Sequence, residues 1–189
     1  MPFRLLGFAA DPGKASNLCG ATFARYAAAG TEVTLVCAAA RDWTANDRLP
    51  IARQLGAGSL VLLDYQLADL TAAGLEDVFA DVMRSVRPHV VVAEGSHTAV
   101  RDATTSAFST VRRRTGGSAA LPAKLYFRPS GGPGTVAVTT AIAVATPAPE
   151  LFVRVFPDPW VTGVLERDLF AGLSADSSTA ATLADRVAS

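Results

Sequence analysis

The chain has 189 residues, 50% of them hydrophobic and 18% charged, so it can bury the core of one α/β domain and its length requires no second. Its 17 basic and 17 acidic residues balance, which excludes the positive field typical of proteins that bind nucleic acid or anionic membranes. The apolar run before Asp11 is too short for a signal peptide, and no segment reaches the ~20 apolar residues of a membrane span. We therefore expect a cytoplasmic protein whose partner is a small molecule or another protein.

Short apolar runs alternate along the chain with longer segments of helical period. The predicted strands lie at 4–10, 31–38, 59–64, 89–94 and 123–129, and a β-rich segment follows a turn (130–134) at 135–144. The predicted helices lie at 21–30, 46–57, 72–86 and 99–114. This order predicts a Rossmann-like fold, a doubly wound, mostly parallel sheet with helices on both faces. One α/β domain is expected over 1–173, and 174–189 is expected to be a tail that forms a loose helix or is disordered.

In such a sheet, ligands bind beyond the carboxyl ends of the strands. The loops that follow four of the predicted strands are therefore the expected site, and they lie at 10–14, 37–43, 64–69 and 94–97. The first loop carries only Gly13 and then Gly20, which matches neither a dinucleotide-binding fingerprint nor a phosphate-binding Walker loop.

Few residues in these loops have the chemistry of a site. Of the two histidines, His89 begins a strand and is expected to be structural, whereas His97 follows a strand end and is either an acid/base group or a neighbour of a helix cap. Asp64 and Tyr65 also end a strand, where they either contact a ligand or form a turn. The two cysteines have no metal-binding spacing and are expected to be buried thiols.

Four stretches, in order along the chain, resemble one family. The opening ADPGKASNLCGATFARYAAAG resembles the start of the LmbE-like, or PIG-L, zinc-dependent N-deacetylases, which begin Ala-His-Pro-Asp-Asp-Glu. The segment LDYQLADL is similar to the family's Leu-Asp-Tyr-x-Asp-Gly-x-Leu, and RPHVVVAEGSHTAVRDATTSAF resembles the strand and helix around its His-Pro-Asp-His motif. FPDPWVTGVLERDLFAGL is similar to a C-terminal segment of actinobacterial members. The resemblance implies the LmbE type of α/β domain and a homo-oligomer.

The first motif departs from the family pattern. Aligning both CGATFARYAAAG and Pro12 with the family pattern places Asp11 at the first zinc-binding histidine, Gly13 at the general-base aspartate and Lys14 at the second zinc ligand, an aspartate. The glutamate that ends the family's motif is replaced by Ala15.

The second motif keeps one ligand. His97 matches the last histidine, the third zinc ligand, while Glu94, Gly95 and Ser96 stand where the family has His-Pro-Asp. A catalytic zinc needs three protein ligands and one open position, and an ammonium group repels a dication. We therefore expect no metal and no hydrolysis by the family mechanism. Our hypothesis is that the Lys14 ammonium occupies the former metal position, held by Asp11 and directed toward His97.

These observations favour a metal-independent enzyme or binder that acts on a small sugar-like or natural-product molecule. The expected catalytic residues are His97, Lys14 and Asp11, and the expected ligand contacts are Gly13, Asp64, Tyr65, Glu94 and Ser96. Two alternatives stay open. One is an inactive pseudoenzyme that serves as a scaffold or oligomer partner. The other is a zinc-dependent N-deacetylase with altered ligands, which would be Asp11, His97 and either Asp102 or Glu94.

Overall fold

The computed structural model describes residues 2–41, 43, 57–115, 121–128, 141–144, 150–156 and 168–173. The strands are β1 (Arg4–Ala9), β2 (Glu32–Cys37), β3 (Ser59–Leu62), β4 (Val90–Glu94), β5 (Lys124–Arg128), β6 (Ala141–Val144) and β7 (Glu150–Phe156). The helices are α1 (Pro12–Ala28), α3 (Ala72–Val86) and α4 (Thr98–Thr115), with a short 3₁₀ turn, η1 (Leu67–Asp69). The predicted helix over 46–57, the turn over 130–134 and the tail over 174–189 lie outside the described residues, apart from Ala57.

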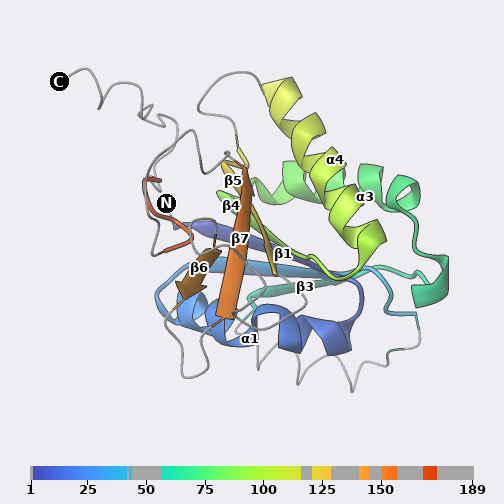
Figure 1. The fold of residues 1–189 in the computed structure, drawn as a ribbon, viewed down its shortest axis with the longest axis horizontal. Coiled ribbons are helices and arrows are strands. Elements are labelled where there is room, and N and C mark those ends of the chain that lie inside the picture. Colours follow the sequence, from blue (N-terminus) through green and yellow to red (C-terminus); the bar gives the residue numbers. More distant parts are fainter. Residues whose placement is uncertain are drawn as a thin grey trace.

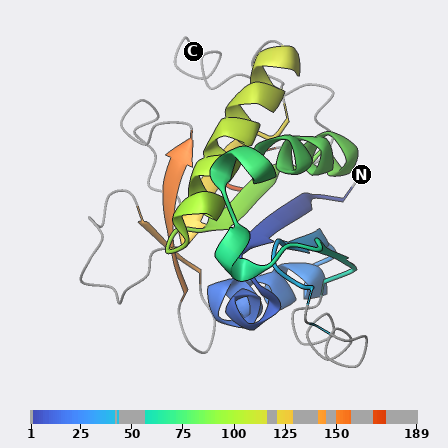
Figure 2. The ribbon, with the colours of Figure 1, turned by 90° about the vertical axis from the view of Figure 1, so that its right-hand side faces the viewer.

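The seven described strands form one sheet in the order β3-β2-β1-β4-β5-β7-β6. The first five pair in parallel, whereas β7 pairs antiparallel with both β5 and β6. Helix α1 covers one face of the sheet, and α3 and α4 cover the other (Figures 1 and 2). The predicted doubly wound, mostly parallel α/β fold is confirmed.

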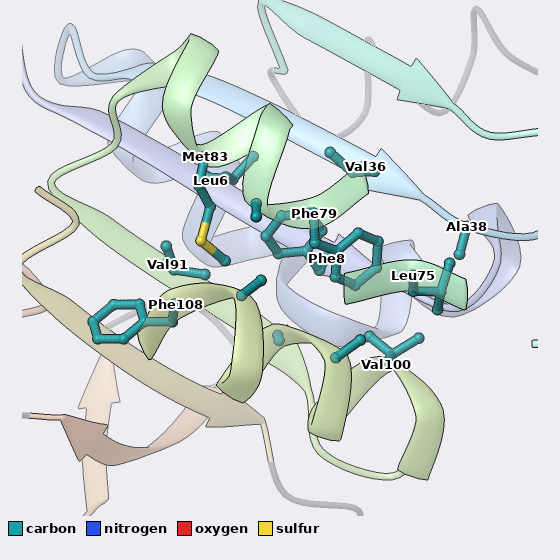
Figure 3. Packing of buried hydrophobic residues seen from close by; sticks show 14 of the residues in the cluster. Leu6, Phe8, Val36, Ala38, Leu75, Phe79, Met83, Val91, Val100 and Phe108 are labelled. Atoms are coloured by element: carbon teal, nitrogen blue, oxygen red, sulfur yellow. The ribbon is translucent and has the colours of Figure 1, made fainter. Parts of the chain in front are cut away.

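Each face of the sheet has its own apolar core. Phe8 of β1 stacks on Phe79 of α3, with ring centroids 4.1 Å apart, and Met83 and Phe108 extend this core between the sheet, α3 and α4 (Figure 3). On the α1 face, Phe23 packs against the sheet beside Gly7, where an added Cβ would lie 2.6 Å from the Phe23 ring. Side chains alternate between the two faces along a strand, so both cores require apolar residues at successive positions.

The segment 168–173 belongs to the core on the α1 face. The Tyr26 hydroxyl of α1 accepts a hydrogen bond from the Leu169 backbone N–H at 3.0 Å, and the Lys124 ammonium at the start of β5 donates to the Ala171 carbonyl at 2.5 Å. Leu169 and Phe170 are both buried. The polar groups of Tyr26 and Lys124 thus have partners inside an apolar layer, as buried polar groups require.

Two sequence predictions about the elements are wrong. The first helix begins at Pro12 and not near residue 21, because Asp11 caps it and Pro12 takes its first position, where proline is favoured. Strand β7 lies beyond the last predicted β segment, where the sequence predicts no strand. Its pairing with β5 and β6 gives the sheet an antiparallel margin that the helix–strand alternation does not predict.

Candidate functional site

Four loops meet at one edge of the sheet, because β3, β2, β1 and β4 are parallel and end there. Chain order reverses between β1 and β4, where the crossover connections leave the sheet in opposite directions. Asp11 follows β1 at this switch point, and Glu94, Ser96 and His97 lie at or just beyond the end of β4. Asp11, Glu94, Ser96 and His97 therefore lie at or just after the carboxyl ends of two neighbouring strands, in two of the loops that the sequence predicts.

Asp11 holds the start of α1. Its backbone is extended (φ −143°, ψ 163°), and its Oδ1 accepts a hydrogen bond from the Lys14 backbone N–H at 2.9 Å. This is N-cap geometry, which satisfies one of the free amides of the first turn. The carboxylate thus binds the backbone of Lys14.

Lys14 itself is exposed, and within the described part of the chain no ion pair joins its ammonium to Asp11. The hypothesis of a buried Lys14 cation in the former metal position is therefore wrong. The reason is the early start of α1, which places Lys14 in the first helical turn on the solvent side.

Glu94 is a buried carboxylate, 5% exposed, whose two oxygens both have partners. Oε2 accepts from the Ala10 backbone N–H at 2.9 Å, and Oε1 accepts from the Ser96 hydroxyl at 2.6 Å. Charge-assisted hydrogen bonds of this kind compensate for the burial of an ionised group. Glu94 thus ties the end of β4 to the end of β1 and to its own loop.

The loop after β4 leads directly into α4. The Gly95 N–H donates to the Arg128 carbonyl at 3.0 Å, and an added Cβ at Gly95 would lie 2.7 Å from that oxygen, so only glycine fits. The His97 carbonyl accepts from the Arg101 N–H at 2.9 Å as α4 begins. The Nδ1 of His97 is buried and has no hydrogen-bond partner among the described residues.

Cys37, at the end of β2, is a buried free thiol as predicted. Burial, with smaller contributions from the nearby charges of Asp11 and Glu94, raises its pKa to about 12. A thiol with so high a pKa is a weak nucleophile and a weak metal ligand at neutral pH.

Asp64 and Tyr65 stand apart from this group. Asp64 is exposed and accepts from the Arg41 guanidinium at 3.3 Å, beside a β-bridge between Asp64 and Ala39. Tyr65 packs against the apolar core of the α3 and α4 face, and its hydroxyl donates to the Gly74 carbonyl at 3.2 Å. Their contacts fit the turn-forming alternative left open by the sequence.

Gly13 lies in the first turn of α1, and an aromatic ring is close to it. An added Cβ would lie 3.1 Å from Asp11 Oδ1 and 3.8 Å from Cζ2 of Trp43. Trp43, the last residue of the predicted site loop 37–43, is thus a neighbour of the candidate site. The other histidine, His89, lies at the opposite edge of the sheet, where its Nδ1 accepts from the Arg4 N–H at 3.1 Å.

The residues at this edge do not fit a zinc ion. Across the described ranges, no group of three or more His, Cys, Asp and Glu side chains is placed to hold a metal. Asp11 is used as a helix cap, both oxygens of Glu94 are used in hydrogen bonds, and the Cys37 thiol is protonated. A catalytic zinc site needs three deprotonated ligands with free lone pairs.

Arg128 is a further residue of this edge that the sequence analysis missed. It ends β5, next to β4, and its Nη1 is buried without a hydrogen-bond partner among the described residues. The sequence offered one signal, an arginine near the end of the predicted strand at 123–129.

The strand order and the loops at this edge define a doubly wound α/β protein whose candidate site lies at the β1/β4 switch point. No family model and no curated protein matches the chain. Several solved structures match the chain in fold. The conserved protein TT1542 from Thermus thermophilus is 22% identical with a TM-score of 0.58, over 74% of this chain and 70% of that one.

Two further structures align less completely. GalB, the 4-carboxy-2-hydroxymuconate hydratase from Pseudomonas putida KT2440, is 18% identical with a TM-score of 0.54, over 66% of this chain and 65% of that one. The N,N'-diacetylchitobiose deacetylase from Pyrococcus horikoshii is 20% identical with a TM-score of 0.45, over 57% of this chain and 49% of that one. At these identities the likeness shows the fold alone. None of the helices among the described residues is long and apolar enough to cross a bilayer.

Proposed function

We propose that this chain binds a small sugar-like or natural-product molecule at the β1/β4 switch point and acts on it without zinc. The observation that carries the proposal is the buried Nδ1 of His97, which has no hydrogen-bond partner among the described residues and lies where such folds bind ligands. A buried polar atom without a partner destabilises the protein, so its presence here favours a role in binding or proton transfer.

The neighbouring residues support a polar ligand and argue against the family's zinc chemistry. Glu94 and Asp11 fix the two loops beside His97 through backbone hydrogen bonds, which hold the site in shape before a ligand arrives. Imidazole exchanges protons near neutral pH, so His97 is the proposed acid/base group. Lys14 remains in the proposal as a solvent-facing cation at the rim.

The structural neighbours do not fix the reaction class. GalB, which shares this fold, is a hydratase, so a protein of this fold need not be a deacetylase. A shared fold does not determine the reaction, which depends on the residues of the site.

Nuclear magnetic resonance of the histidines tests the proposal, because the chain has only two. A panel of monosaccharides, N-acetylglucosamine and glucosamine included, is titrated into protein with labelled imidazoles. We expect at least one compound to shift the His97 signals and leave those of His89, at the other edge of the sheet, unchanged. The variant H97N identifies the signals and should lose the binding, whereas D102N on α4 should keep it.

The same samples test the zinc alternative. Calorimetric titration of zinc should show no one-to-one binding that depends on His97 or Asp102. Stoichiometric zinc binding that H97N abolishes would refute the metal-free proposal. If no compound of the panel shifts His97, the binding proposal itself is wrong and the scaffold alternative gains support.

A further inference from the structure

Arg128 is a charged residue at the candidate site that has no ion-pair partner in the part of the chain that the structure describes. It closes β5, and its carbonyl accepts the hydrogen bond from Gly95, two residues before His97. The Nη1 of its guanidinium is buried and lacks a hydrogen-bond partner, and no ion pair of Arg128 occurs among the described residues.

An acidic residue beside Arg128 in the sheet forms its hydrogen bonds with other groups. Glu94 is the register partner of Arg128 across the β4/β5 pair. Both oxygens of Glu94 nevertheless accept hydrogen bonds from other groups, the Ala10 N–H and the Ser96 hydroxyl. Arg128 instead places its guanidinium carbon 5.7 Å from the centre of the Phe152 ring of β7.

This contact gives Nη1 no hydrogen-bond acceptor. Arg128 as a whole is partly buried, but a buried N–H without an acceptor is unfavourable, and a cation–π contact offsets only part of that cost. Lys124, at the opposite end of the same strand, shows how a buried cation is usually stabilised. Its ammonium donates a hydrogen bond to the Ala171 carbonyl. The Nη1 of Arg128 has no such acceptor among the described residues, and Arg128 lies at the edge where sheets of this kind bind ligands.

We propose that Arg128 binds an oxyanion of the ligand, either a carboxylate or a phosphate. The inference rests on the proposed binding function and adds the class of ligand. The guanidinium presents parallel N–H groups that match the two oxygens of such an anion, which a lysine does not. Neighbouring strands are about 4.8 Å apart, so a sugar-sized molecule beside the loop of His97 reaches the end of β5.

Three probes of similar size test the inference by calorimetry: D-glucose, D-glucuronate and D-glucose 6-phosphate. We expect wild-type protein to bind at least one of the two anions about tenfold or more tightly than glucose, and the tighter anion identifies the group. In R128Q this preference should disappear. R113Q removes an equal charge from the exposed last turn of α4 and should keep it.

Two results would overturn the inference. One is a folded R128Q that keeps the anion preference, and the other is wild-type protein that binds glucose and the anions equally. If R128Q does not fold, R128K keeps the charge without the planar fork and should lose most of the preference. If glucose shifts the His97 signals and the anions bind no more tightly than glucose, this inference is wrong and the proposed function stands. If none of the three probes shifts the His97 signals, the proposed function is wrong as well.

Discussion

Replacing Glu94 separates its structural role from a role in ligand binding. In E94A, the buried Ala10 N–H loses its acceptor at 2.9 Å and the Ser96 hydroxyl loses its acceptor at 2.6 Å. An unpartnered buried amide costs about 1–3 kcal/mol, and the lost hydrogen bond of Ser96 adds about 1 kcal/mol. We therefore expect the free energy of unfolding to fall by about 3 kcal/mol.

The amide of E94Q provides the matched comparison. The amide oxygen of the glutamine can accept from the Ala10 N–H, and its NH₂ can donate to the Ser96 hydroxyl oxygen. Both hydrogen bonds are therefore kept without the charge. The expected loss is about 1 kcal/mol, similar to that of S96A, which removes only one bond. Urea unfolding followed by circular dichroism measures all three variants. If E94A were less than about 1 kcal/mol below wild type, the assignment of Glu94 as the tie between β1 and β4 would be wrong.

Four further changes test the site. D11A removes the N-cap of α1 and should lower the free energy of unfolding by about 1 kcal/mol, whereas D11N should restore most of it, as thermal unfolding can show. K14A should change that free energy by less than about 0.5 kcal/mol, because Lys14 is exposed; a large loss would revive the buried-cation hypothesis. G95A should destabilise by more than about 1 kcal/mol and weaken ligand binding, since its Cβ would meet the Arg128 carbonyl; unchanged urea midpoints would contradict this. The pKa of Cys37 is about 12 in the fold against an ordinary 9.0, so its protonated thiol stabilises the fold fully below pH 9, and this contribution is lost as the pH rises toward 12. At pH 10 the free energy of unfolding has lost about 1.4 kcal/mol of the Cys37 contribution. In C37A, the decrease in the free energy of unfolding between pH 8 and pH 10 should therefore be smaller than in wild type by that amount.

The sequence predicts the elements best where local signals agree. The helix over 72–86 has the predicted bounds, because Thr71 caps its start, its apolar residues recur with helical period, and a proline follows its end. Asp11 and Pro12 also carry a helix-start signal, an N-cap residue followed by proline, yet the following Gly13 and Lys14 resemble a turn. The pairing of β7 depends on contacts with β5, which is distant in sequence, so no local pattern predicts it.

The candidate site is only partly predictable, for a physical reason. Loop positions follow from the strand order, so the sequence places Asp11, Glu94 and His97 at one edge. Hydrogen-bond partners depend on side-chain directions, and these decide that Glu94 is fully engaged while Lys14 faces solvent. The isolation of one nitrogen of Arg128 is a property of the packed structure and has no counterpart in a sequence pattern.

The hydrogen bonds that Leu169 and Ala171 make with Tyr26 and Lys124 bear on how this protein can be shortened or fused. A truncation before Asp168 would remove the hydrogen-bond partners of the Tyr26 hydroxyl and the Lys124 ammonium. It would also expose part of the apolar core on the α1 face to water. We expect such a protein to aggregate on expression. Affinity tags or fusion partners should be attached after Leu173, where they leave these buried groups covered.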